Sequence, residues 1–425
     1  MNVLVVGGGG REHALCWALS RSSTVFCAPG NPGTTTLGSN LSIDIDNHAV
    51  LIDTVHQHGI DLVVVGPETP LADGLVDSLA DAGIPAFGPT RAAAQLEASK
   101  AFAKSVMAAA GVPTATSETF TNEARALDYI SGFSEPLVVK ASGLAAGKGV
   151  IICQTRDQAT NAITEMFGGR FGTAGQEVIV EEHLEGEELS VFAMTDGEQT
   201  MLLPSAQDHK RLGEGDTGPN TGGMGAYTPV SIATDAMLAL VNEEVLIPTL
   251  RQMAADGHPF RGMLYAGLMI DASGTPFVLE FNCRFGDPET QVVLPAAGDL
   301  DLAAHMFAIA NGDAWNAPSQ IPATQAAVTT VVAASGYPAA PVQGASIDVP
   351  SPLPPDTLLF HAGTKLDDQG ILRAGGGRVL CATGLGGSVT EAAQRSRELA
   401  EAVAFEHAVF RRDIAWREVA RAGAA

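Results

Sequence analysis

The chain has 425 residues, of which 46% are hydrophobic and 17% are charged. These values indicate a well-buried globular protein of roughly two to four domains, and they exclude a disordered chain or a small disulfide-stapled scaffold. The 24 Lys and Arg residues are outnumbered by 48 Asp and Glu residues, so the formal net charge is −24. Nonspecific binding to nucleic acid or to an anionic membrane is therefore not expected.

The five cysteines are scattered and form no C-x-x-C pair, so neither a disulfide framework nor a zinc site is predicted. No basic leader precedes the first apolar run and no apolar stretch reaches membrane-spanning length, which predicts a cytoplasmic protein. Only six lysines occur, and most fall in Gly-rich or otherwise unusual segments: Lys100, Lys104, Lys140, Lys148 and Lys210. In so acidic a chain, retained ammonium groups are candidates for holding an anion.

The first part of the chain alternates short apolar runs with helix-like stretches. The runs cover 3–6, 24–28 and 61–65, and the helical stretches cover 12–20 and 49–57. Such alternation predicts a parallel sheet with crossover helices. One further helix is predicted over about 91–110, ending at Gly111-Val112-Pro113.

Beyond residue 120 the pattern changes to paired β runs. Runs at 137–140 and 150–153 flank a Gly-rich loop, which predicts a small lid-like α+β unit. Residues 263–270 and 276–284 are separated by the turn Asp271-Ala272-Ser273-Gly274 and one further residue, and they predict a β-hairpin. Residues 317–324 form a predicted linker to a third α/β domain. The Gly- and Asn-rich stretch at 205–227 is predicted to be a long, functional loop.

The glycines of V-L-V-V-G-G-G-G-R-E-H-A (3–14) lie between a strand and a helix start. Free backbone N–H groups there favour a phosphate site, although simple tight-turn glycines remain an alternative. A dinucleotide site would need a third glycine where Glu12 stands, which weakens that interpretation.

The segment L-V-V-K-A-S-G-L-A-A-G-K-G-V-I-I-C (137–153) superficially resembles a P-loop. Its glycine spacing is wrong, Gly149 follows Lys148 where Ser or Thr is required, and a strand follows rather than a helix. We therefore predict a loop that folds over a polyphosphate, with Lys140 at its base and Lys148 within it. An ordinary hairpin loop is the alternative.

A third segment, V-L-E-F-N-C-R-F-G-D-P-E-T (278–290), predicts a metal site. Side chains alternate along a strand, so Glu280, Asn282 and Arg284 share one face. A carboxylate and an amide oxygen suit Mg²⁺ bound to a nucleotide, with Arg284 beside them to hold an oxyanion. A salt-bridged surface strand is the alternative.

With these segments, the sequence resembles the ATP-grasp superfamily and, within it, the phosphoribosylamine–glycine ligase family. Further matching strings are V-V-G-P-E-T-P-L (64–71), Q-L-E-A-S-K (95–100), Q-D-H-K-R (207–211) and D-T-G-P-N-T-G-G-M-G-A-Y (216–227). The resemblance implies an α/β fold (α+β ATP-grasp) in three parts. These are a Rossmann-like N-terminal domain in 1–100, an ATP-grasp domain in 101–317 with a lid subdomain at about 120–193, and a small C-terminal domain in 325–421.

The resemblance also implies site residues. ATP would be bound by Lys100, Lys140, Gly147, Lys148, Gly149, Glu181, Glu182, His183, Leu184 and Glu188. Mg²⁺ or Mn²⁺ would be held by Glu280 and Asn282, while the acidic ligand that many members carry on the preceding strand is replaced by Gly267. The implied catalytic residues are Arg284, Lys140 and Asp208, and the implied substrate-binding residues are Gly9, Gly10, Arg11, Glu68, Asp208, Lys210, Arg284 and Asp287.

The implied reaction joins glycine to 5-phosphoribosylamine through glycyl phosphate, with ATP as the energy source. We expect a monomer that acts on small molecules. The alternatives are another ATP-grasp ligase or carboxylase with a different acceptor, an oxidoreductase that uses the first glycine loop, and a noncatalytic nucleotide sensor.

Overall fold

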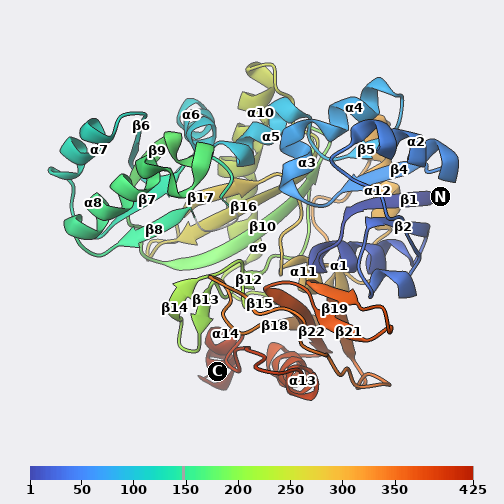
Figure 1. The fold of residues 1–425 in the computed structure, drawn as a ribbon. Coiled ribbons are helices and arrows are strands. Elements are labelled where there is room, and N and C mark those ends of the chain that lie inside the picture. The colour runs from blue at the N-terminus through green and yellow to red at the C-terminus, as the bar shows by residue number, and fades with distance from the viewer. Residues whose placement is uncertain (146–148, 425) are drawn as a thin grey trace.

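The computed structural model of the chain describes residues 1–145 and 149–424. An N-terminal unit in blue, a central sheet of long strands and a C-terminal unit in orange and red together form a mixed α/β fold (Figure 1). In the described ranges, no helix has both the length and the apolar character that crossing a bilayer requires.

The N-terminal unit is a five-stranded parallel sheet with the order β3-β2-β1-β4-β5, which confirms the predicted Rossmann-like architecture. Its apolar runs are buried because helices cover both faces of a parallel sheet. The strands are β1 (Asn2–Gly7), β2 (Thr24–Pro29), β3 (Ser39–Asn40), β4 (Leu62–Val65) and β5 (Ala86–Phe87). The helices are α1 (Gly10–Leu19), α2 (His48–His58), α3 (Glu68–Asp73) and α4 (Leu75–Asp81).

The single helix predicted over 91–110 is wrong, because two helices occupy this region. They are α5 (Arg91–Ala98) and α6 (Lys100–Ala110), and between them Ser99 adopts an extended conformation with φ −134° and ψ 109°. The Ser99 hydroxyl accepts a hydrogen bond from the Phe102 amide, so Ser99 is the N-cap of α6. This break places Lys100 at the first position of the second helix.

A four-stranded antiparallel sheet with the order β6-β9-β7-β8 forms the lid-like unit. It lies at the end of the molecule opposite the N-terminal unit (Figure 1). Its strands are β6 (Ser117–Phe120), β7 (Leu137–Ala141), β8 (Val150–Cys153) and β9 (Val178–Glu182). Helices α7 (Glu123–Ile130) and α8 (Arg156–Glu165) share its hydrophobic core, and short helical turns follow at Met166–Arg170 and Gly172–Gln176.

The central sheet has the order β11-β10-β16-β17. Its strands are β10 (Glu187–Thr195), β11 (Thr200–Leu202), β16 (Gly262–Ile270) and β17 (Pro276–Asn282). Strands β16 and β17 pair antiparallel, which confirms the predicted hairpin. Residues 187–193, placed in the predicted lid subdomain, belong to β10 and pair with β16. The helices of this part of the chain are α9 (Asp235–Val241), α10 (Ile247–Ala255), α11 (Thr290–Ala296) and α12 (Leu302–Asn311).

The C-terminal sheet has the order β12-β15-β18-β22-β19. The predicted strands and helix are present as β18 (Ala326–Ala333), β19 (Thr357–His361), β22 (Arg378–Gly386) and α13 (Val389–Ala402), and α14 (Trp416–Ala424) ends the chain. A small hairpin is formed by β20 (Thr364–Leu366) and β21 (Leu372–Ala374).

The stretch at 205–227 is not the continuous loop that its composition predicts. It contains β12 (Gln207–Asp208), β13 (Arg211–Gly213), β14 (Thr217–Asn220) and β15 (Gly225–Thr228). Strands β12 and β15 extend the C-terminal sheet through β15–β18 pairing, a non-local contact that local composition does not encode. The middle of the chain is thereby joined to its C-terminal part.

Candidate active site

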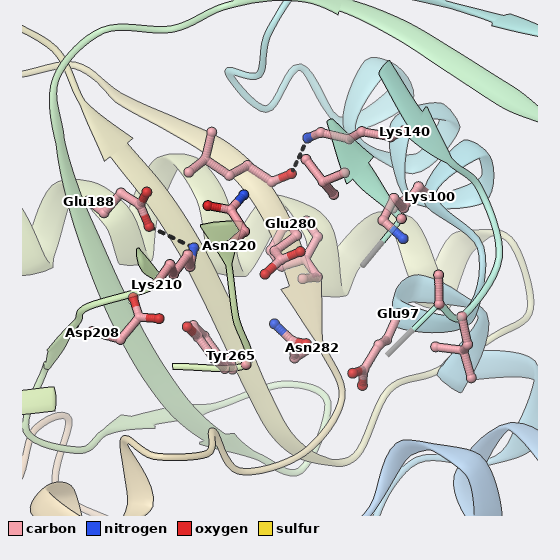
Figure 2. Close-up of a pocket in the computed structure, with 18 of the residues that line it drawn as sticks. Glu97, Lys100, Lys140, Glu188, Asp208, Lys210, Asn220, Tyr265, Glu280 and Asn282 are labelled. Carbon is pink, nitrogen blue, oxygen red and sulfur yellow. Dashed lines mark hydrogen bonds and ion pairs between the residues drawn. The ribbon is translucent and has the colours of Figure 1, made fainter. Parts of the chain in front are cut away.

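A cavity of about 520 Å³ lies where the lid-like unit, the central sheet and the N- and C-terminal units meet. Its walls carry charged and polar residues from distant parts of the sequence: Arg11, Glu68, Lys100, Lys140, Asp208, Lys210, Glu280 and Asn282. Figure 2 shows Lys100 and Lys140 on one side of Glu280, and Lys210 with Glu188 on the other.

The predicted metal ligands lie at the end of β17. Glu280 and Asn282 are both half-buried or buried and both face the cavity, while Phe281 between them is packed in the core. Burial would raise the pKa of Glu280, but Lys210, Lys100 and Lys140 together hold it below its usual value. Glu280 is therefore an ionised carboxylate facing a cavity.

The donor set fits a hard divalent cation that is shared with a nucleotide. No group of three or more His, Cys, Asp or Glu side chains in metal-binding arrangement occurs among the described residues. Mg²⁺ commonly uses one or two protein oxygen ligands and takes the rest from phosphates and water. Gly267 pairs directly with Glu280 in the hairpin, so the preceding strand offers no carboxylate opposite it.

Two lysines and one carboxylate form a buried ion-pair cluster at the base of the lid-like unit. Glu181 makes ion pairs with Lys140 and with Lys104, the latter at 2.8 Å. Lys140 Nζ also donates to the Leu279 carbonyl on β17 at 3.2 Å, which ties the lid to the central sheet. Burial would raise the pKa of Glu181, but Lys140 and Lys104 lower it.

Lys100 reaches the cavity from the start of α6. Its backbone amide donates to the Ser142 carbonyl at 2.9 Å, and its Nζ lies 3.4 Å from the Gly143 carbonyl, at the beginning of the loop between β7 and β8. Burial lowers the pKa of Lys100, and Glu280 opposes this. Gly149 lines the cavity at the other end of that loop, whereas the predicted ligands Gly147 and Lys148 lie outside the described residues.

The end of β9 forms another wall of the cavity. Glu182, His183 and Leu184 all line it, and the Glu182 carboxylate accepts a hydrogen bond from the Thr116 amide at 2.7 Å. Glu188 is paired with Lys210 at 2.6 Å. A ribose that binds Glu188 would have to share this carboxylate with Lys210.

Asp208 and Lys210 reach the cavity from the β12 segment. Burial raises the pKa of Asp208 to about 8, and Lys210 opposes that effect. Burial would lower the pKa of Lys210, but Glu188 and Asp208 raise it well above its usual range. The Lys210 ammonium is therefore protonated. A further cation near Asp208 would lower the pKa of that carboxyl group and favour its ionised form.

Arg284 is held between two carboxylates at the N-terminal side of the cavity. Its Nη2 donates to Glu97 at 2.9 Å and to the Asn282 side-chain oxygen at 3.0 Å, and Glu68 lies 3.5 Å from its Nε. The Nε has no hydrogen-bond partner among the described residues. Arg284 is thus positioned by protein contacts, with its remaining donor buried against Glu68.

The structure does not bring all predicted substrate residues to the cavity. Arg11 and Glu68 line it, but Gly9 and Gly10 do not. The Gly9 amide, expected to be free for a phosphate, donates to the Glu12 carboxylate at 2.7 Å in a helix cap. The Asp287 carboxylate is already engaged by Arg378 at 2.8 Å and by Gln291 at 2.7 Å.

Comparison with known proteins assigns the family. The chain matches three models in order: the N domain of phosphoribosylglycinamide synthetase over residues 1–97, its ATP-grasp (A) domain over 98–290 and its C domain over 327–417. It is 48% identical over 431 residues to the phosphoribosylamine–glycine ligase of Vibrio vulnificus, with 99% of each chain covered. The chain belongs to the phosphoribosylamine–glycine ligase family.

Other relatives agree with this assignment. The Agrobacterium fabrum phosphoribosylamine–glycine ligase is 46% identical, with 99% of each chain covered. The crystal structure of the Thermotoga maritima phosphoribosylamine–glycine ligase has 34% identity and a TM-score of 0.84, covering 97% of this chain and all of that one. A biotin carboxylase from Campylobacter jejuni, at 12% identity and a TM-score of 0.73, shares the fold. The chain is thus an ATP-dependent ligase of the ATP-grasp fold.

The structure adds site residues that sequence reasoning missed in this ligase family member. Glu97, Tyr265, Glu289 and Arg378 line the cavity but were not predicted. Glu97 occurs within the string Q-L-E-A-S-K (95–100), so a weak signal existed for it. Glu289 also lies within the segment at 278–290, but its 2.6 Å hydrogen bond to Tyr265 could not be predicted, because the proximity of the two depends on the β16 register and the turn after β17.

Proposed function

We propose that the chain joins glycine to 5-phospho-D-ribosylamine at the expense of ATP, giving glycinamide ribonucleotide, ADP and phosphate in purine biosynthesis. The observation that carries the proposal is one cavity in which Glu280 and Asn282 face Lys100, Lys140 and Lys210. Cations and hard-oxygen ligands around one space suit the transfer of a phosphoryl group.

The nucleotide would lie between the lid-like unit and the central sheet. Lys100 and Lys140 would contact its phosphates, Glu181–Leu184 its base and Glu188 its ribose. Gly147, Lys148 and Gly149 would belong to the covering loop. Support comes from the contact of Lys140 with β17 and from the position of His183 and Leu184 on the cavity wall.

Glu280 and Asn282 would hold Mg²⁺ or Mn²⁺. When bound, the ion neutralises the triphosphate and lowers the charge repulsion against an incoming carboxylate. The residues of the chain would add to this effect, since Lys210 and Lys100 already lower the pKa of Glu280 and so lie close to the same position.

In the first step, a glycine carboxylate oxygen attacks the γ-phosphorus of ATP, the bond to the bridging β–γ oxygen breaks and ADP leaves. Glycyl phosphate results. In the second step, the neutral amine of phosphoribosylamine attacks the carbonyl carbon, the carbon–oxygen bond to phosphate breaks, and the nitrogen loses one proton. We assign no dedicated general base, because the amine is a nucleophile as it stands. A closed cavity would protect the acyl phosphate from water.

Glycine would bind between Asp208 and Arg284. Its carboxylate would lie beside the Arg284 guanidinium, which lines the cavity, and its ammonium group would lie near Asp208 and lower the pKa of that carboxyl. Arg11 and Glu68 would contact the phosphoribosyl end. Asp287 would act by fixing Arg378 at the same wall, since both of its oxygens are engaged. We propose that the chain works as a cytoplasmic monomer on these small molecules, without nucleic acid or membrane partners.

The experiment that tests the function measures ADP release with ATP, Mg²⁺ and freshly generated phosphoribosylamine. Glycine is compared with formate and bicarbonate as the carboxylate, and the product is identified by mass. ADP release that requires both glycine and the amine, with the mass of glycinamide ribonucleotide, is expected. Release driven by formate or bicarbonate would contradict the proposal.

A further inference from the structure

Asp208 and Lys210 face the cavity, and the residue between them faces the opposite way. His209 is buried, with 1% of its side chain exposed, and its Nε2 accepts a hydrogen bond from the Ala415 amide at 2.9 Å. Alternation along an extended segment produces this arrangement. The two cavity-facing side chains are therefore coupled by the backbone to the C-terminal segment at 411–417.

Arg411 secures the next residue of the same segment. It is 1% exposed, and its Nη1 donates to the Arg211 carbonyl at 3.0 Å and to Asp216 at 2.9 Å. Its Nε and Nη2 both donate to Asp413 at 2.8 Å. A buried guanidinium with this many directed donors fixes the geometry of its neighbours more tightly than a flexible ammonium does.

The segment needs such support because of its place in the sheet. Strand β12 is at the edge of the C-terminal sheet and is paired along one side by β15. Past Asp208, the His209 amide still donates to Gly225, while Arg411 and Ala415 hold the segment from the C-terminal side.

Two residues that contact His209 or Arg411 have strained backbones. Asp216 has φ 56° and Ala415 has φ 67°, both in the left-handed region that residues other than glycine rarely adopt. Such conformations persist when surrounding contacts over-determine them, and they concentrate near functional sites. Asp216 is held by Arg411 and by Arg417, the latter at 2.6 Å, and Ala415 is held by His209.

We propose that His209 and Arg411 are positioning residues that set where Asp208 and Lys210 stand in the cavity. The proposal rests on the proposed function, in which Asp208 contacts glycine and Lys210 is one of the cations that face Glu280 in the cavity. Displacement of a reacting group by about 1 Å can lower a rate about 100-fold. Lys210 pairs with Glu188, the proposed ribose ligand, at 2.6 Å, so a displaced Lys210 would free that carboxylate rather than remove a nucleotide contact. The wall at Glu181–Leu184 lies outside the His209 and Arg411 contacts, so nucleotide affinity should be preserved.

The test compares His209→Leu, which removes the acceptor for Ala415, with His209→Gln, which can retain one, and adds Arg411→Lys. Matched controls are His407→Leu and Arg412→Lys, whose side chains are 75% and 60% exposed. We expect kcat to fall at least tenfold in His209→Leu and Arg411→Lys, and to recover to within threefold of wild type in His209→Gln. The dissociation constant for MgADP should stay within twofold of wild type, and both controls should behave as wild type.

A double-variant cycle separates positioning from general damage. If Arg411 acts through Asp208 and Lys210, then adding Arg411→Lys to a variant that carries both Asp208→Ala and Lys210→Ala should leave its kcat unchanged within twofold. Independent, multiplying losses would overturn the proposal, as would an unchanged kcat per folded molecule or a loss of MgADP affinity in step with kcat. If His209→Leu and Arg411→Lys do not fold, Asp216→Asn is used instead, because the Asp216 side chain is 24% exposed. Its kcat and its dissociation constant for MgADP are judged by the same limits.

Wild-type turnover is measured first. A wild-type chain without glycine-dependent ADP release would contradict the proposed function. An active wild type with equally active variants would contradict only the positioning role.

Discussion

Gly267 pairs directly with Glu280 in the hairpin of β16 and β17, and a Cβ atom added at Gly267 would lie 3.4 Å from Glu280 Cγ. The strand next to the proposed metal site therefore contributes backbone rather than a carboxylate. Of the two proposed metal ligands, Glu280 and Asn282, only Glu280 therefore carries a negative charge.

Replacing Glu280 with Ala should abolish ATP turnover and leave the fold intact. We expect kcat to fall by roughly a thousandfold or more, because the proposed site loses its charged ligand. Near-wild-type circular dichroism and thermal midpoint are expected, since the side chain faces a cavity. The exposed Glu118→Ala in the same ATP-grasp region is the control. An active Glu280→Ala enzyme would refute the metal assignment.

Replacing Lys140 with Met should weaken nucleotide binding. The loss of a hydrogen bond from a charged group is worth about 1.5–3 kcal/mol, which corresponds to roughly a 10- to 150-fold rise in the dissociation constant of ATP. Calorimetric titration measures it, with the exposed Arg125→Ala of α7 as the control. A change below threefold would remove Lys140 from the nucleotide site.

The cap at Ser99 offers a test that separates stability from binding. Ser99→Ala should cost about 1 kcal/mol of folding free energy and should also raise the KM for ATP, because Lys100 is the first residue of the capped helix. Thr234→Ala removes the equivalent cap of α9, away from the cavity. Similar losses of stability with a raised KM only in Ser99→Ala are expected, and equal KM values would count against the role of Lys100.

Stability should fall as the pH drops below 6.5. Burial lowers the pKa of His13 to about 3 and that of His361 to about 4. The unfolded chain binds protons at these residues below about 6.5 while the native state does not, so each contributes about 1.4 kcal/mol of destabilisation one pH unit below that value. The loss would be complete near the native pKa values.

Urea unfolding at pH 7.5 and pH 5.5 measures this effect. His13→Gln should lose less stability between the two pH values than the wild type, and His407→Gln, at an exposed site, should match the wild type. Identical pH dependence in all three proteins would show that His13 does not stay neutral in the folded state.

The sequence predicts the architecture well where the signal is local. Apolar runs such as 61–65 predict buried parallel strands, and the run at 278–284 predicts the face shared by Glu280 and Asn282. Contacts between distant segments are not predictable in this way. The residues on both sides of Ser99 favour a helix, so the sequence does not show that Ser99 ends one helix and caps the next. The pairing of β15 with β18 joins residues about a hundred positions apart.

The candidate site shows the same division. Lysines and carboxylates at their motif positions do line one cavity, but the free phosphate-binding amide expected at Gly9 is taken by Glu12. Nor does sequence reveal that Glu181 is shared by Lys104 and Lys140, or that Arg378 reaches Asp287 from the C-terminal sheet. Each of these contacts is set by tertiary packing rather than by local pattern.

The measurement that tests the central claim most directly follows the oxygen of glycine. Glycine labelled with ¹⁸O in its carboxylate is incubated with the enzyme, ATP, Mg²⁺ and phosphoribosylamine, and the released phosphate is analysed by mass. Transfer of one labelled oxygen to each phosphate is predicted, because glycine attacks the γ-phosphorus and the acyl carbon–oxygen bond later breaks. Unlabelled phosphate released together with the amide product would contradict a glycyl phosphate intermediate.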